Sequence, residues 1–315
     1  MMSVQSTKVG FVGLGRVGKP IARRILRAGF PLTVYDLRSE PVDELTKEGA
    51  GKARNPKEVA EASEVVLTSL PHPKVSEEVF LGKDGLLAGA KKGNILVETS
   101  TVPSSFVVYL ANATKEKGVQ VIDVSVSGAS STLISGGQFR AAAGELVLMI
   151  GGDKEAVERV RPILQTFGKS LIHMGEVGQG AIAKVVNNAM GQANFVAACE
   201  ALAAGVKAGG DPKLLYKAIS ICSGQSWTFN ATIRGYIEGE KSGIMNTDLA
   251  YKDSEAILQL GKETGVPMWM HSAKLAFFEA ARIAGYGDKP WVETMKMWED
   301  MLGIKIRSGP ETKST

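Results

Sequence analysis

The stretch Gly13-Leu14-Gly15-Arg16-Val17-Gly18 decides the fold. It has the spacing GxGxxG, follows an apolar run at residues 8–12 and opens a helical pattern over residues 16–28. In such a unit the first glycine permits a tight turn, the second lets backbone approach a pyrophosphate, and the third packs helix against strand. Free N–H groups at the helix N-terminus then bind the phosphates. We therefore predict that these six residues bind a dinucleotide.

The next apolar run, at residues 32–35, ends at Asp36. An acidic residue at this distance accepts hydrogen bonds from the adenosine ribose hydroxyls and repels a 2′-phosphate. Asp36 therefore favours NAD. Arg38 follows two residues later and is able to pair with a 2′-phosphate, so NADP stays open as an alternative. A glycine-rich turn that binds nothing is disfavoured, because strand, turn, helix and acid coincide.

The order of sequence patterns along the chain predicts two domains. Residues 1–174 alternate short apolar runs with helical patterns, which predicts an α/β domain with a Rossmann-type doubly wound parallel sheet. Residues 175–306 show helical patterns, of which 180–207 is the longest, and predict an all-α domain. Residues 307–315 form a polar tail, expected to fray.

The composition excludes several classes of protein. With 44% hydrophobic and 22% charged residues and a net charge of +4, a mainly disordered chain and a nucleic-acid partner are not expected. No apolar run is long enough for a membrane span, and the first residues do not resemble a secretory signal. Cys199 and Cys222 predict no disulfide framework, and three scattered histidines predict no metal site. The expected location is the cytoplasm.

Two further segments contain candidate site residues. Ser125, Ser127 and Gly128 end the apolar run that starts at residue 119. Ligands bind beyond the carboxyl ends of such strands, where hydroxyl and N–H donors are able to hold a carboxylate. A plain Ser/Gly turn explains the segment equally well.

The second segment is the start of the long helical pattern. Lys184 stands among Ala, Ile and Val, and Asn188 shares its helix face one turn later. A lysine there is costly unless it is paired or functional, and its pKa can be tuned for proton transfer. Gly180, one turn earlier, is expected to leave room for a bound molecule. A lysine that reaches solvent along its alkyl chain is an equally weighted alternative for Lys184.

With these motifs the chain resembles the β-hydroxyacid dehydrogenase family, of the 3-hydroxyisobutyrate dehydrogenase type with a 6-phosphogluconate dehydrogenase-like C-terminal domain. The resemblance covers nearly the whole chain. The cofactor motif stands at residues 13–20 and the substrate motif at residues 123–128. The family's catalytic motif GxxGxGxxxKxxxN is matched by Gly175, Gly178, Gly180, Lys184 and Asn188.

The resemblance implies roles for further residues. Its cofactor loops are matched by Leu70, Pro71, Ser100 and Thr101, and its later cofactor lysine by Lys252 beside Asp253. Trp227 falls in a segment that resembles the substrate side of the dehydrogenase branch. Ser125, Ser127 and Gly128 would hold an anionic small-molecule substrate.

The implied activity is hydride transfer between NAD and a small β-hydroxy acid, or the matching semialdehyde or keto acid. Lys184 would be the general acid/base, Asn188 would orient the lysine or the reacting oxygen, and no metal is needed. The helical domain would form a homodimer or homotetramer. An imine reductase, which typically replaces the lysine, and a non-catalytic cofactor-binding module are the alternatives on the same fold.

The departures from the family pattern concern mainly the substrate side. Ser125 replaces a proline and Ala129 a second glycine, whereas Val17 for methionine is a mild packing change. The chain between Ser127 and Gly144 is longer than the family spacing, so Arg140 and its neighbours have no counterpart. These departures leave the substrate open more than the cofactor: acid length, branching, and a sulfonate or phosphonate in place of the carboxylate are all alternatives.

Overall fold

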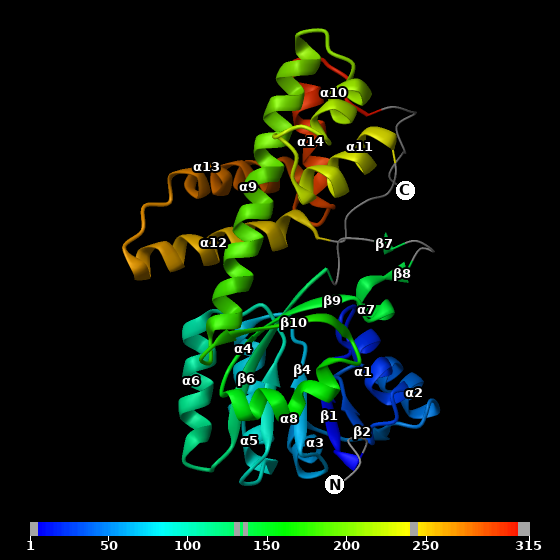
Figure 1. The fold of residues 1–315 in the computed structure, drawn as a ribbon, viewed down its shortest axis with the longest axis vertical. Coiled ribbons are helices and arrows are strands. Elements are labelled where there is room, and N and C mark those ends of the chain that lie inside the picture. Colours follow the sequence, from blue (N-terminus) through cyan, green and yellow to red (C-terminus); the bar gives the residue numbers. More distant parts are fainter. Residues whose placement is uncertain (1–5, 129–132, 135–137, 240–244, 308–315) are drawn as a thin grey trace. The chain divides into compact units, whose positions relative to one another are not determined.

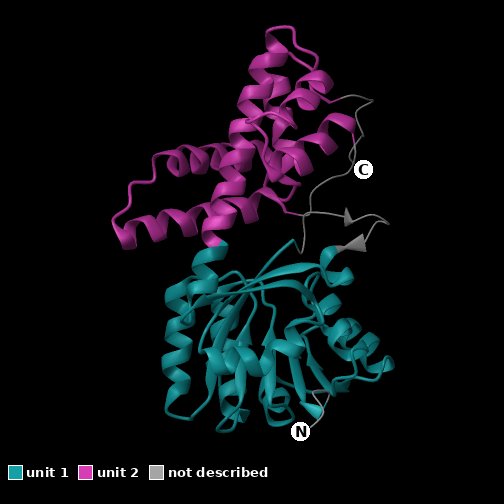
Figure 2. Ribbon diagram, viewed as in Figure 1, with its two compact units in different colours: residues 1–129, 133–184 teal, residues 130–132, 185–315 magenta. Residues whose placement is uncertain are grey.

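The computed structural model describes residues 6–128, 133–134, 138–239 and 245–307. These divide into two compact units, one ending at Lys184 and the other beginning at Val185 (Figure 2). Ala129, Thr132 and all of the predicted polar tail except Arg307 lie outside the described residues. Each unit is considered by itself.

The first unit is built on an eight-stranded sheet with the order β10-β9-β6-β5-β4-β1-β2-β3 (Figure 1). Neighbouring strands are parallel except for β6 and β9, which are antiparallel. The strands are β1 (Val9–Val12), β2 (Leu32–Tyr35), β3 (Gly51–Lys52), β4 (Val65–Thr68), β5 (Ile95–Glu98), β6 (Gln120–Ser127), β9 (Leu146–Gly151) and β10 (Gly168–Gly175). A separate two-stranded sheet joins β7 (Leu133–Ile134) and β8 (Gln138–Phe139). The predicted Rossmann-type sheet is confirmed.

Helices flank this sheet, and two apolar cores fill its two faces. The helices are α1 (Gly18–Arg27), α2 (Ser39–Lys47), α3 (Pro56–Glu61), α4 (Pro73–Leu81), α5 (Leu86–Gly89), α6 (Ser104–Lys115), α7 (Arg140–Ala143) and α8 (Lys154–Leu164). Alternate residues of one strand enter different cores: Val65 and Leu67 of β4 join one, and Val66 joins the other. This is the alternation expected of a strand buried on both faces.

The apolar runs do not predict every strand, and the short strands β3, β7 and β8 as well as β10 were missed. The apolar run at residues 141–150 is not one strand, because α7 precedes β9. Strand β10 was not predicted, because most of its residues are exposed and it carries no apolar run. It lies at the edge of the sheet, where one-sided burial is ordinary.

The elements of the second unit that the structure describes are helices, as predicted. The unit contains α9 (Gln179–Lys207) from Val185 onward, α10 (Pro212–Ile219), η2 (Phe229–Ile233), α11 (Arg234–Glu238), α12 (Thr247–Thr264), α13 (Trp269–Ala281), η3 (Arg282–Tyr286), η4 (Trp291–Thr294) and α14 (Met295–Leu302). Its core contains Phe195 and Trp291, whose rings stack at 4.5 Å. Helices α12 and α13 lie side by side (Figure 1). Among the described residues, no helix is long and apolar enough to cross a membrane.

Candidate active site

The glycine turn lies where the direction of strand order reverses. Strand β1 stands between β2 and β4, and ligands of doubly wound sheets bind at such a switch point. Gly13 has a φ of +93°, and a Cβ there would collide with the Ser69 carbonyl oxygen. A Cβ on Gly18 would collide with the Gly13 carbonyl oxygen, whereas one on Gly15 would meet nothing within 4 Å. The turn is therefore closed at its two ends and open over Gly15, which fits a pyrophosphate.

Asp36 is joined to this turn by hydrogen bonds. Its Oδ2 accepts from the Leu14 backbone N–H at 2.6 Å, and its Oδ1 accepts from Arg38 Nε at 3.0 Å. Burial raises the pKa of the Asp36 carboxyl, but the hydrogen bonds from Arg38 and Leu14 outweigh burial and hold this pKa below its usual range. The Arg38 side chain is 63% exposed and folds back onto this carboxylate. The predicted ribose acceptor is therefore a charged carboxylate already paired with Arg38.

The two predicted cofactor loops after β4 and β5 are bonded to each other. The Leu70 N–H donates to Ser100 Oγ at 2.8 Å. The Ser100 N–H donates in turn to Glu98 Oε1 at 2.7 Å, which also accepts from Thr68 Oγ1 at 3.0 Å. Burial raises the pKa of the Glu98 carboxyl against these hydrogen bonds. Glu98, which was not predicted as a site residue, thus holds the Ser100 loop in place. The predicted residues Pro71 and Thr101 are the next residues after Leu70 and Ser100.

Asp123 joins the predicted substrate strand to the start of α9. Its Oδ1 accepts from the Gly178 N–H at 2.6 Å, and its Oδ2 accepts from the Ala181 N–H at 2.7 Å. Burial raises the pKa of this carboxyl, and the backbone hydrogen bonds counteract it. Strand β6 continues from Asp123 to Ser127, so one carboxylate fixes the helix that carries Lys184 against the strand that carries the serines.

Gly180 does not leave room for a bound molecule, so this prediction was wrong. A Cβ on Gly180 would lie 2.7 Å from Asp123 Oδ2 and 2.5 Å from the Met149 carbonyl oxygen. Protein atoms fill the space, and the missing side chain lets α9 approach β6 and β9. Sequence spacing predicts on which helix face Gly180 lies, but it does not predict that Asp123 and Met149 pack against that face.

The substrate residues of β6 differ in exposure. Ser125 is 3% exposed and pairs with Met149 of β9, whereas Ser127 is partly exposed and pairs with Val147. Gly128 follows with a φ of +90°. Ser127 and Gly128 are therefore more accessible to a ligand than Ser125.

Two predicted residues of the second unit, Asn188 and Lys252, meet at Asp253. Asn188 Nδ2 donates to Asp253 Oδ2 at 2.8 Å, and Lys252 Nζ lies 3.9 Å from Asp253 Oδ1. Asp253 is buried, whereas Lys252 is one-third exposed. Lys184 is partly buried on α9, one helical turn before Asn188 and within the first unit.

A polar network adjoins this group and was not predicted. Gln192 Oε1 accepts from Lys274 Nζ at 2.9 Å and from Ser254 Oγ at 3.0 Å. Lys274 is 2% exposed, and burial lowers the pKa of its amine to about 8, although the charge of Asp253 opposes the shift. The signal was available: Lys274 is a lysine in an apolar helical pattern, as Lys184 is.

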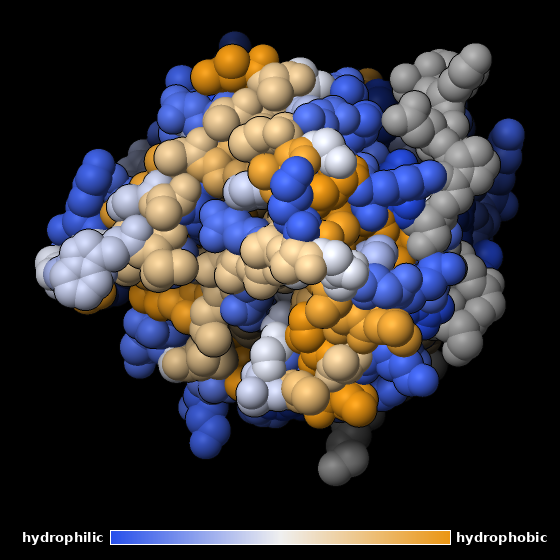
Figure 3. Space-filling model, turned by 90° about the horizontal axis from the view of Figure 1, so that it is seen from above, coloured by the Kyte–Doolittle hydropathy of each residue, from blue (hydrophilic) through white to orange (hydrophobic). Residues whose placement is uncertain are grey.

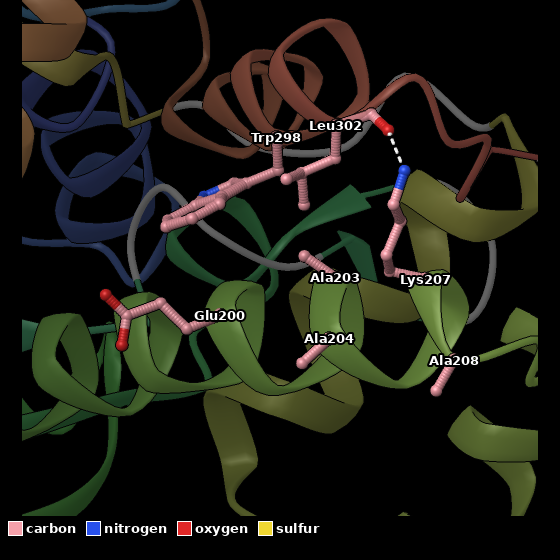
Figure 4. A pocket seen from close by; sticks show the side chains of 7 residues that line it. All are labelled: Glu200, Ala203, Ala204, Lys207, Ala208, Trp298 and Leu302. Atoms are coloured by element: carbon pink, nitrogen blue, oxygen red, sulfur yellow. Dashed lines mark hydrogen bonds between the residues drawn. The ribbon is translucent and has the colours of Figure 1, made fainter.

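Two other features of the second unit stand apart. Trp227, the predicted substrate contact, is half exposed just before η2. An apolar groove of about 500 Å³ lies between α9 and α14, and Lys207 Nζ donates to the Leu302 carbonyl beside it (Figure 4). Its lining residues are Glu200, Ala203, Ala204, Lys207, Ala208, Trp298 and Leu302. None of them is a predicted site residue, so we do not include the groove in the site.

Two family models match this chain. The family model for the NAD binding domain of 6-phosphogluconate dehydrogenase matches residues 8–175. The model described as NAD-binding of NADP-dependent 3-hydroxyisobutyrate dehydrogenase matches residues 178–298.

Individual relatives match over nearly their full length. The 2-(hydroxymethyl)glutarate dehydrogenase of Eubacterium barkeri is 34% identical, with 97% of this chain and 99% of the relative covered. The NAD-dependent L-serine dehydrogenase of Pseudomonas aeruginosa is 31% identical, with 94% and 99% covered. The crystal structure of a 3-hydroxyisobutyrate dehydrogenase from Salmonella typhimurium superposes with a TM-score of 0.79 at 26% identity, covering 93% of this chain and 100% of that one.

Fold, glycine turn and comparisons together define an NAD(P)-dependent dehydrogenase that acts on CH–OH groups. Within that class, the chain belongs to the β-hydroxyacid dehydrogenase family.

Proposed function

We propose that this protein oxidises, or forms by reduction, a small β-hydroxy acid with Lys184 as general acid/base. The bound nicotinamide cofactor supplies the hydride chemistry, which the side chains of this chain do not provide. Gly13, Gly15 and Gly18 would hold its pyrophosphate, and Asp36 its adenosine ribose.

The observation that carries the proposal is the double hydrogen bond of Asp123. It ties the strand of Ser127 and Gly128 to the first turn of the helix that bears Lys184. A carboxylate held by the Ser127 hydroxyl and the Gly128 N–H would leave the rest of a small substrate beside that helix. Lys184 would then accept the hydroxyl proton on oxidation and return it on reduction.

The names of three of the matched proteins support a substrate class. 3-Hydroxyisobutyrate, L-serine and 2-(hydroxymethyl)glutarate all carry a primary alcohol on the carbon next to the one that bears the carboxylate. We propose the same pattern for this protein's substrate. We also propose NAD over NADP, because Asp36 is charged at the ribose position and engages Arg38.

Substitution of the lysine tests the reaction. Lys184→Met should lower kcat with NAD and β-hydroxy acids by about 10²–10⁴-fold, the range of general acid–base catalysis. NAD affinity, measured by fluorescence titration, should stay within about threefold of that of the wild type. Lys213→Met, which changes an exposed lysine of α10, is the matched control. Near wild-type turnover by Lys184→Met would contradict the mechanism, and turnover of cyclic imines instead of hydroxy acids would favour an imine reductase.

We further propose a cytoplasmic homodimer or homotetramer. Exposed hydrophobic side chains of the second unit support association. Figure 3 shows hydrophobic surface between hydrophilic residues on one face of the protein. The exposed hydrophobic side chains of the second unit include Met190, Leu214, Ile221, Trp227, Trp269, Met270, Ile283 and Met301. Light scattering after size exclusion would test this, since a monomer mass would refute it. The exposed free thiol of Cys222 supports a reducing compartment.

A further inference from the structure

Arg140 lies against the predicted substrate loop. A Cβ built on Gly128 would be 3.0 Å from Arg140 Cδ and 3.6 Å from Arg140 Nη1. Because Gly128 has no side chain, its backbone directly faces the Arg140 side chain. Arg140 is the first residue of α7 and belongs to the same unit as Ser127 and Gly128. A positive charge therefore stands beside the donors proposed to hold a carboxylate.

The Arg140 guanidinium has one buried donor without a partner in the described part of the protein. Its Nε is shielded from solvent and finds no hydrogen-bond acceptor among the described residues. Glu145 is an acidic residue close to Arg140 in sequence, but it pairs with another residue: its Oε1 lies 3.7 Å from Lys169 Nζ. A guanidinium N–H that loses water without gaining an acceptor costs free energy, so this position is unfavourable without a ligand.

Arg24 shows what a structural arginine looks like in the same region. Its Nε donates to the Thr166 carbonyl oxygen at 2.5 Å, and its Nη1 donates to that of Ala142 at 3.0 Å. Arg24 therefore joins α1 to α7 and to the segment after α8, whereas no such bond links Arg140, two residues before Ala142, to another described residue.

We propose that Arg140 binds a second acidic group of the substrate, so that the protein selects a β-hydroxy acid with two anionic groups. This rests on the proposed function, in which the Ser127 hydroxyl and the Gly128 N–H already bind the first carboxylate. Those donors are neutral and suffice for one carboxylate. Arg140 adds a full charge and a planar fork of N–H donors, which matches a further carboxylate.

Binding of matched anions tests the proposal without turnover. With NAD present, calorimetry would compare glutarate with pentanoate, which has the same chain length and one carboxylate. We expect the wild type to bind glutarate at least tenfold more tightly, and Arg140→Met to abolish this preference. Arg140→Lys, which keeps the charge and loses the fork, should retain part of it. Arg159→Met, at an exposed arginine of α8, is the control and should change nothing.

Turnover of 2-(hydroxymethyl)glutarate and 2-(hydroxymethyl)pentanoate gives the second comparison. Arg140→Met should lower kcat/KM for the diacid about 10- to 100-fold and leave the monoacid within about threefold. An equal loss for both would mean that Arg140 binds the shared carboxylate, which overturns the proposal, as would no loss for either. Arginine-dependent glutarate binding without turnover of any hydroxy acid would refute the proposed function but support the anion site.

Discussion

Lys274 offers a direct test of the electrostatics of the second unit. Its amine is buried, hydrogen-bonded to Gln192 Oε1, and has a pKa of about 8 instead of the usual 10.5. The perturbation is Lys274→Met, which keeps a similar length and removes the titrating group. His271, three residues earlier, has a pKa lowered by burial and by the Lys274 charge, so His271 stays neutral above pH 7 and does not contribute.

The sign and size follow from proton linkage. The pKa of Lys274 is lower in the folded state, so the unfolded chain binds more protons between about pH 8 and 10.5, and the free energy of unfolding rises with pH there. At about 1.36 kcal/mol per pKa unit, the buried amine costs roughly 3 kcal/mol at pH 7 and roughly 1 kcal/mol at pH 10. The wild type should therefore gain about 2–3 kcal/mol relative to Lys274→Met between these pH values.

Urea unfolding at pH 7 and pH 10 measures this difference. All four tryptophans (Trp227, Trp269, Trp291 and Trp298) lie in the second unit, so their fluorescence reports the unit that contains Lys274. Other groups titrate in both proteins and cancel in the comparison. Lys262→Met, at an exposed lysine of α12, should track the wild type at both pH values. Parallel pH dependence of wild type and Lys274→Met would refute the buried-amine reasoning.

Three further changes test the first unit. Asp123→Asn places an amide N–H against the N–H of Gly178 or Ala181, so unfolding free energy should fall by about 1–3 kcal/mol and kcat by at least tenfold, read by urea melts and the 340 nm assay. Gly180→Ala should cost about 1–3 kcal/mol by overpacking, again by urea melts, and unchanged stability would contradict the close approach of α9. Arg38→Gln should leave kcat/KM with NAD within about threefold and lower it with NADP at least tenfold, which equal effects on both cofactors would contradict.

The parts of the site that could be predicted are those encoded in local spacing. The glycine turn and Asp36 lie within one strand–turn–helix–strand unit, so their relation follows from the pattern of a single stretch. Lys184 and Asn188 are related by one helical turn, which fixes their common face. The alternation of apolar runs with helical patterns likewise predicts helices on both faces of the sheet, since each strand buries residues on both faces.

The rest depends on contacts between distant segments. Asp123 bonds to residues 55 and 58 positions later, and Gln192 bonds to a lysine 82 positions later. No periodicity relates such pairs, so the anchor of α9 and the partner of Lys274 were not predicted. The prediction for Gly180 was wrong for the same reason, because the space left by its missing Cβ is filled by Asp123 and not by a ligand.

These distant contacts also give the proposed role of Asn188 a direction. The carboxylate of Asp253 only accepts hydrogen bonds, so the Asn188 amide must turn its Nδ2 toward it. The Oδ1 end then points away from Asp253 and accepts from Asn187 Nδ2 at 3.1 Å. In this orientation the Asn188 amide presents its Oδ1 acceptor on the side away from Asp253. An acceptor there suits a protonated lysine or a substrate hydroxyl and not a carbonyl oxygen. In the proposed reaction, Asn188 would therefore stabilise the states in which the lysine or the substrate hydroxyl carries the proton. Asp253 would affect the chemistry only by holding the Asn188 amide in place.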